Sequence, residues 1–133
     1  MSEDMEHYLR EINFDKQYNK IIQKYKNKKI IIYGAGQLFQ TICEKYDLTK
    51  LNIIGISDGK YTSADEEQEF LNYKKIPLDK IADYKPDYVL VSTLRYLSII
   101  ENFEDNVFKN SKIKIRPLAT KGFWQVLKEI WVG

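Results

Sequence analysis

Cysteine and histidine are almost absent from this sequence of 133 residues, which contains one of each, Cys43 and His7. A single cysteine cannot form an internal disulfide or supply a cysteine-based zinc site. With one thiol and one imidazole, Ser-His or Cys-His nucleophilic catalysis and metal catalysis are nearly excluded. We therefore predict no metal site, and we interpret Cys43 as a small core residue and His7 as a surface residue.

Long apolar runs are lacking as well, because nowhere do about 18 apolar residues follow one another. No transmembrane helix is therefore predicted. The charges spread over residues 1–28 argue against the apolar stretch of a signal peptide. Together with the single cysteine, this pattern predicts a cytoplasmic protein without a membrane partner.

No charge of one sign dominates the chain, which carries 21 Lys and Arg against 19 Asp and Glu, for a net charge of +2. A pI near 8.5 is less basic than a nucleic-acid-binding domain usually is, so no nucleic-acid partner is predicted. Arginine is scarce, and its planar guanidinium group is suited to bind phosphate or carboxylate, so each arginine is a candidate ligand-binding residue. The three are Arg10, Arg95 and Arg116.

The composition that is present, 44% hydrophobic and 30% charged, is typical of a soluble globular protein. The length suits a single domain. We predict three parts within it: a helical extension at 1–28, an α/β core at 29–117 and a C-terminal helix at 118–133.

Short apolar runs, rich in β-branched residues, alternate with amphipathic segments along the core, which predicts a parallel sheet covered by helices on both faces. The strands are expected at 30–33, 53–58, 75–78, 88–93 and 112–116, and the helices at 3–12, 16–26, 37–46, 79–84, 96–108 and 120–131. The acidic segment 59–74 is predicted to be a solvated loop with at most a short helix. We expect an α/β fold with a doubly wound sheet of about five strands in the order 3-2-1-4-5. Its switch point lies between 30–33 and 88–93.

A glycine turn, Gly34-Ala35-Gly36-Gln37, follows the first predicted strand and opens a helix. Gly34 permits a tight turn, and Gly36 lets a phosphate approach free backbone N–H groups at the helix N-terminus. Phe39 occupies the position where a dinucleotide fingerprint has a third glycine or alanine. The turn predicts phosphate or nucleotide binding, and the alternative is a purely structural turn.

Asp58 ends the second predicted strand, 24 residues beyond Gly34. A carboxylate at this place accepts hydrogen bonds from ribose hydroxyls and repels a 2′-phosphate. The alternative is a turn aspartate before Gly59.

Ser92, Thr93 and Arg95 follow the fourth predicted strand, next to the glycine turn at the switch point. The two hydroxyls are candidates to bond a ligand, or else they cap the helix at 96–108. A cation at the start of a helix is unfavourable for the helix dipole, so Arg95 either binds a ligand phosphate or carboxylate or pairs with a surface acid.

The C-terminal segment carries Phe123, Trp124 and Trp131. These aromatic residues either cover the sheet or form a dimer contact. An interaction protein that forms a homodimer through the helix at 120–131 is therefore one alternative reading of the chain.

Four segments resemble a known group of domains: residues 31–36, 54–58, 76–81 and 86–93. They are similar to the Rossmann-like nucleotide-binding domains of bacterial surface-polysaccharide enzymes, namely the N-terminal domains of sugar acyltransferases and of nucleotide-sugar dehydratases. In the acyltransferase group the resemblance implies that Gly34, Gly36 and Asp58 contact a UDP-sugar. In the dehydratase group the same positions would face a dinucleotide such as NAD.

The chain contains no hexapeptide repeat, no membrane span and no convincing Tyr-Lys pair, and no general base with a tuned pKa is evident, so no catalytic residue is assigned. We predict a nucleotide- or nucleotide-sugar-binding module for cell-surface polysaccharide biosynthesis, fused to or associated with a sugar-modifying enzyme. The alternative is an NAD-dependent oxidoreductase or sugar-modifying enzyme of the same fold.

Overall fold

The computed structural model describes residues 2–121. The α-helices in this range are α1 (Ser2–Glu11), α2 (Phe14–Lys24), α3 (Gln37–Lys45) and α4 (Tyr96–Asn102). The strands are β1 (Lys29–Tyr33), β2 (Asn52–Ser57), β3 (Glu69–Phe70), β4 (Tyr73–Lys74), β5 (Tyr88–Val91) and β6 (Lys114–Pro117). The shorter elements are the 3-10 helices η1 (Ser63–Asp65) and η2 (Leu78–Tyr84) and the π-helical turn η3 (Phe103–Val107). The helix predicted at 120–131 lies outside the described residues.

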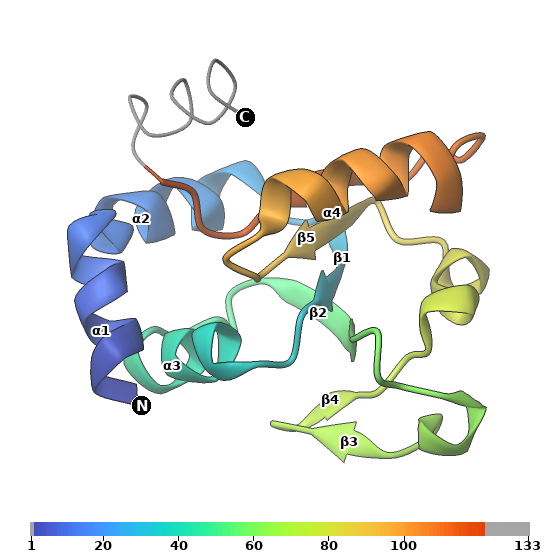
Figure 1. Ribbon diagram of the computed structural model, residues 1–133, viewed down its shortest axis with the longest axis horizontal. Helices are drawn as coiled ribbons and strands as arrows, with labels where there is room; N and C mark the ends of the chain where they lie inside the picture. Colours follow the sequence, from blue (N-terminus) through green and yellow to red (C-terminus); the bar gives the residue numbers. More distant parts are fainter. Residues whose placement is uncertain (1, 122–133) are drawn as a thin grey trace.

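Four strands form a parallel sheet in the order β2-β1-β5-β6 (Figure 1). The parallel α/β architecture is confirmed, but the sheet has four strands where about five were predicted. The predicted order 3-2-1-4-5 is not formed in full, because the strand at 75–78 is missing from the sheet and the other four follow the order 2-1-4-5. β1 lies between β2 and β5, so the loops that follow β1 and β5 leave the same edge of the sheet next to each other.

The strand expected at 75–78 is reduced to an isolated parallel bridge between Lys75 and Ile56. Ile76 still donates its N–H to the carbonyl of Ile56 at 2.8 Å. The chain turns at Pro77 into η2, so Leu78 does not continue the pairing with β2. The fifth strand therefore ends after a single bridge.

The segment predicted as a solvated loop, 59–74, contains instead the antiparallel hairpin β3–β4 in addition to η1 (Figure 1). Its two-residue turn, Leu71-Asn72, has φ of +54° and +69°, which is the left-handed conformation that such tight hairpins require. The hairpin lies beyond β2, away from the glycine turn.

Both faces of the sheet are covered, as alternate residues of β1 show. Ile30 and Ile32 pack into one cluster with the buried side chains of α1, α2 and α3. Ile31 points to the opposite face and packs into a second cluster with α4, η2 and η3. All three isoleucines have no exposed surface, which explains the continuous apolar run of this strand.

The described helices are too short or too polar to cross a membrane.

Candidate functional site

A groove of about 410 Å³ lies at the carboxyl ends of β1, β2 and β5. In parallel sheets this edge, at the switch point, is where ligands bind. Every predicted binding residue except Ala35 lines the groove, which brings together Gly34, Gly36, Gln37, Asp58, Ser92, Thr93 and Arg95. Ala35 is 1% exposed and belongs to the core.

Gly34 makes the sharp turn out of β1, with φ of +116°, a conformation that residues with a Cβ rarely adopt. It is held on both sides, because its N–H donates to the Ser57 carbonyl at 2.9 Å and its carbonyl accepts the Ser92 hydroxyl at 2.7 Å. A Cβ at this position would lie 3.0 Å from the Ser92 carbonyl oxygen. The first glycine is therefore required by the close approach of the loop after β5.

Asp58 accepts backbone N–H groups on both carboxylate oxygens. Ala35 donates to Oδ2 at 2.8 Å and Lys60 donates to Oδ1 at 3.1 Å. The carboxylate thus ties the glycine turn to the loop after β2. It lines the groove and each oxygen retains a further lone pair, so the turn role and the ribose role predicted for it are compatible.

The first turn of α3 is open to the groove. Gly36 is the N-cap, no side chain of the described residues caps the helix, and the first helical bond runs from Gln40 N–H to the Gly36 carbonyl at 3.1 Å. Gly36 and Gln37 are exposed, and a Cβ at Gly36 would meet no atom within 4 Å. N–H groups at such a helix end are suited to bind an anion.

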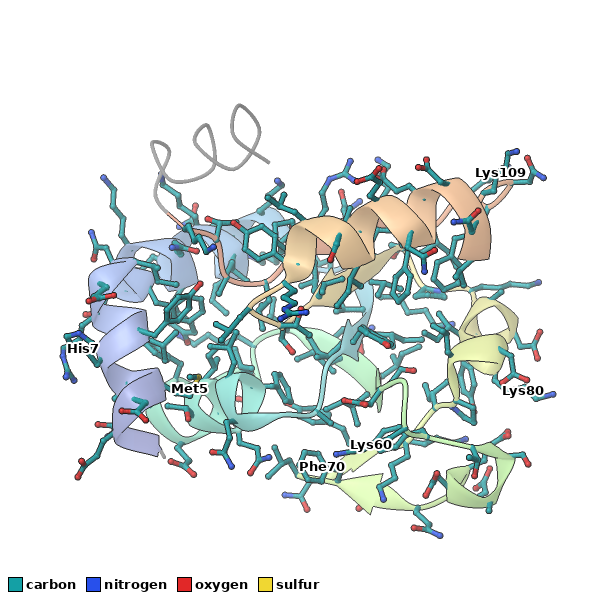
Figure 2. All side chains as sticks on the ribbon, viewed as in Figure 1. Met5, His7, Lys60, Phe70, Lys80 and Lys109 are labelled. Atoms are coloured by element: carbon teal, nitrogen blue, oxygen red, sulfur yellow. The ribbon has the colours of Figure 1, made fainter. Side chains whose placement is uncertain are left out.

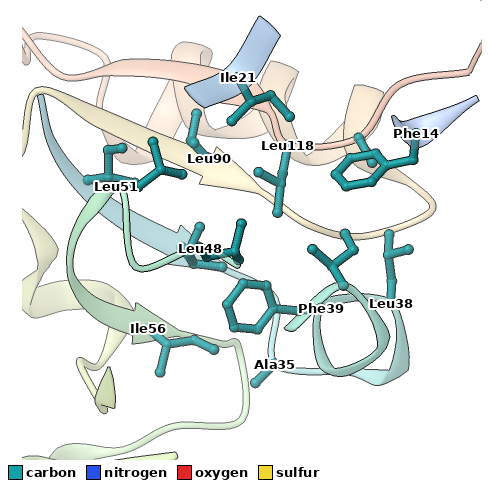
Figure 3. Close-up of a cluster of buried hydrophobic side chains, with 14 of the residues drawn as sticks. Phe14, Ile21, Ala35, Leu38, Phe39, Leu48, Leu51, Ile56, Leu90 and Leu118 are labelled. Carbon is teal, nitrogen blue, oxygen red and sulfur yellow. The ribbon is translucent and has the colours of Figure 1, made fainter. Parts of the chain in front are cut away.

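Phe39 does not enter the groove, although it replaces the third glycine of the dinucleotide pattern. Figure 3 shows its ring pointing from α3 into the core, toward Leu48 and Ile56. The side chain has no exposed surface, and its ring centroid lies 6.1 Å from that of Tyr73. The aromatic ring therefore fills the space between α3 and the sheet and leaves the glycine turn open.

The three residues after β5 differ in their contacts. Ser92 uses its hydroxyl to bond the Gly34 carbonyl, so its role in this structure is to shape the turn. Thr93 Oγ1 is buried and has no hydrogen-bond partner among residues 2–121. Arg95 is exposed at the N-cap of α4, and no ion pair of the described chain includes it.

Two tyrosines lie close to the aspartate of the groove. Burial raises the pKa of Tyr33 above its ordinary value, and the Asp58 carboxylate adds to the effect. Burial, with Asp58 and Asp65 as further causes, raises the pKa of Tyr61 to about 12. Both phenols are therefore neutral near neutral pH.

The apolar side of the groove consists of residues that the sequence pattern did not single out: Met5, Leu38, Leu94 and Ile99. Figure 2 shows Met5 between α1 and α3, so the N-terminal helix contributes to the site. The amphipathic pattern of α1 predicts a helix with a buried face, but it carries no signal for the place where that face docks.

Two other hollows of similar size lack the features of a ligand site that the groove has. One, of about 370 Å³, lies between α1, α2 and α3, where Lys45 pairs with Glu6 at 3.1 Å. The second, of about 420 Å³, lies at the amino ends of β5 and β6 and is lined by exposed lysines. Neither combines open helix N–H groups with the carboxyl ends of the strands. In the described residues no group of three or more His, Cys, Asp or Glu side chains is placed to hold a metal ion.

The fold and the groove define a small α/β domain with a parallel sheet and a ligand-sized groove at the carboxyl ends of its strands. Residues 26–114 match the C2185-like N-terminal domain, and the chain belongs to this family. The matched range includes β1 to β5 and every predicted binding residue. No curated protein and no solved structure is significantly similar to the chain.

Proposed function

We propose that this chain is a nucleotide- or nucleotide-sugar-binding module with a Rossmann-like arrangement of its sheet. The observation that carries the proposal is the uncapped first turn of α3, where Gly36 and Gln37 present exposed backbone to the groove. A phosphate group fits this place because the N–H groups and the helix dipole both favour an anion.

The other polar groups of the groove suit the rest of such a ligand. Arg95 lacks an acidic partner in the described chain, so its guanidinium is available for a second phosphate or a sugar carboxylate. Asp58 has lone pairs left to accept ribose hydroxyls. Thr93 Oγ1 is a buried hydroxyl without a partner, and a ligand oxygen would satisfy it.

The resemblance of residues 31–36, 54–58, 76–81 and 86–93 to domains of surface-polysaccharide enzymes favours a UDP-sugar or NAD as the ligand. We propose a binding role in polysaccharide biosynthesis, exerted with a fused or associated sugar-modifying enzyme. An oxidoreductase would require an acid or base in the groove. Asp58 is the one carboxylate among the lining residues described, and its bonds to the Ala35 and Lys60 N–H groups give it a structural role in addition to any contact with a ligand.

Isothermal titration calorimetry with UDP, a UDP-sugar and NAD tests the proposal. We expect one of them to bind, and we expect Arg95→Gln to weaken that binding by about tenfold, since one charged contact is worth about 1.4 kcal/mol. Arg10→Gln is the matched control, because Arg10 is also an exposed arginine but lines the hollow between α1 and α3. It should leave the affinity unchanged.

The proposal is wrong if none of these nucleotides binds at millimolar concentration. It is equally wrong if Arg10→Gln and Arg95→Gln weaken binding to the same extent, because that result would indicate unspecific attraction of an anion to a cationic surface.

A further inference from the structure

The groove lies at the carboxyl ends of three of the four parallel strands. Its polar lining residues follow β1, β2 and β5, and none of the described lining residues comes from β6 or from residues 118–121. A dinucleotide binds across both mononucleotide-binding halves of such a sheet, one on each side of the switch point. Here β5 and β6 form the second half, so a second nucleotide would have to lie at the carboxyl end of β6.

The protein's own chain fills the carboxyl end of β6. Beyond Pro117 the chain still follows β5, because the N–H of Leu118 donates to the Val91 carbonyl at 2.9 Å. Leu118 and Ala119 are 1% and 2% exposed, and both belong to the core cluster that the sheet forms with α1, α2 and α3. A ligand could enter this space only by displacing core side chains.

The next two residues are fixed by α2 and α4. The Gln17 side-chain amide donates to the Thr120 carbonyl and accepts the Thr120 N–H, both at 2.8 Å. The N–H of Lys121 donates to the hydroxyl of the buried Tyr96, in the first turn of α4, at 3.1 Å. Figure 1 shows this last described stretch, in red, running between α2 and α4. These bonds hold residues 118–121 in the half of the sheet that a second nucleotide would need.

The polar groups of the groove match one nucleotide unit. The uncapped first turn of α3 and the guanidinium of Arg95 suit one diphosphate. Asp58 is the one carboxylate among the described lining residues, which suits one ribose, whereas a dinucleotide has two. The volume of about 410 Å³ lies near the lower end of the range for small-molecule pockets, which is about 300–1,000 Å³.

We propose that the groove takes a single nucleoside diphosphate, free or carrying a sugar that extends out of the groove, and that residues 118–121 exclude the second nucleotide of a dinucleotide. The inference rests on the proposed nucleotide binding and narrows its ligand to one class. NAD then binds through its ADP unit or does not bind.

Calorimetry with two pairs of ligands tests this inference. Each pair shares its first nucleotide: ADP is compared with NAD, and UDP with diuridine diphosphate. In the pair whose base the groove accepts, the dinucleotide should bind no more tightly than the diphosphate. Arg95→Gln should weaken both members of that pair by the same factor, because both place the same diphosphate beside the guanidinium.

Amide chemical shifts provide a second measurement. The N–H resonances of Thr120 and Lys121 should stay in place when either dinucleotide is added, since their bonds to Gln17 and Tyr96 persist. The inference is overturned if a dinucleotide binds more than about tenfold more tightly than its diphosphate, or if it shifts Thr120 and Lys121 while the diphosphate does not. Either result would leave the proposed nucleotide binding standing. Binding of none of the four ligands would instead reject the proposed function, and the inference with it.

Discussion

Replacing Gly34 by alanine should destabilise the fold far more than replacing Gly36, although both glycines belong to one turn. At Gly34 a Cβ would lie 2.9 Å from the Thr93 methyl group and 3.0 Å from both the carbonyl oxygen and the hydroxyl oxygen of Ser92. The Ser92 backbone cannot withdraw easily, because its N–H donates to the Tyr33 carbonyl at 2.8 Å.

Two costs add up for Gly34→Ala. Holding an alanine near φ of +116° costs about 1–3 kcal/mol, since residues with a Cβ avoid this region. The overlap with the fixed Ser92 carbonyl costs about another 1–3 kcal/mol, as overpacking does elsewhere. We therefore expect the free energy of unfolding to fall by roughly 2–6 kcal/mol.

Gly36→Ala should change the free energy of unfolding by less than about 1 kcal/mol, because φ is −88° there and a Cβ would meet no atom within 4 Å. Urea denaturation measures both variants. With a slope of about 2 kcal/mol per molar urea, Gly34→Ala should lower the midpoint by roughly 1–3 M. Equal midpoints for the two variants would refute the assignment of Gly34 as the strained, close-packed glycine of the turn.

Three further predictions concern stability. Asp58→Ala should lower the free energy of unfolding by about 2 kcal/mol, because the N–H groups of Ala35 and Lys60 lose a charged acceptor, and an unchanged urea midpoint would contradict that role. Gln17→Ala should cost about 2 kcal/mol through the lost bonds to Thr120 and Ile12. Gln17→Glu should cost at least as much, because a carboxylate oxygen would then face the carbonyls of Thr120 and Ile12, and a Glu variant as stable as the native protein would argue against these bonds. Stability should also fall as the pH rises from about 9 to about 12, because burial raises the pKa of Cys43 to about 11 and of Tyr61 to about 12. For both groups the pKa is higher in the folded state than in the unfolded state. The stability that the neutral thiol and phenol contribute is therefore complete below the unfolded pKa and is lost as the pH rises through the folded pKa. Urea midpoints that stay constant over this range would contradict the prediction.

The central strands were predictable because their sequence leaves little choice. A continuous run such as Ile30-Ile31-Ile32 is too short for a helix and has no polar side, so it suits a strand buried on both faces. The run ends in two glycines, which mark the turn. The structure places β1 at Lys29–Tyr33, within one residue of the expected strand.

The hairpin and the fifth strand were not predictable from the same signals. Two-residue strands are too short to show an alternating pattern, and the turn Leu71-Asn72 lacks the glycine that usually marks a tight hairpin. The acidic residues before it suggested a solvated loop. At Pro77, the rule that proline is tolerated in edge strands favoured a strand, whereas in the structure the chain turns there into η2.

The candidate site was predictable as a place but not as a set of contacts. The carboxyl ends of parallel strands share one edge, so the loops after β1, β2 and β5 had to converge. Two contacts depend on loop conformations for which the sequence carries no signal. Asp58 accepts a backbone N–H on each carboxylate oxygen, and the Ser92 hydroxyl donates to the Gly34 carbonyl. Met5 reaches the groove through the docking of α1, which is a tertiary contact.

Backbone amide chemical shifts during a nucleotide titration test nucleotide binding at the first turn of α3 most directly. A UDP-sugar or NAD should shift the N–H resonances of Gly36 and Gln37 most strongly, with smaller shifts at Thr93 and Arg95. Largest shifts among Lys28, Lys85 and Lys112, which line the hollow at the opposite end of the sheet, would contradict the proposed site, and no shifts with any nucleotide would contradict the proposed function.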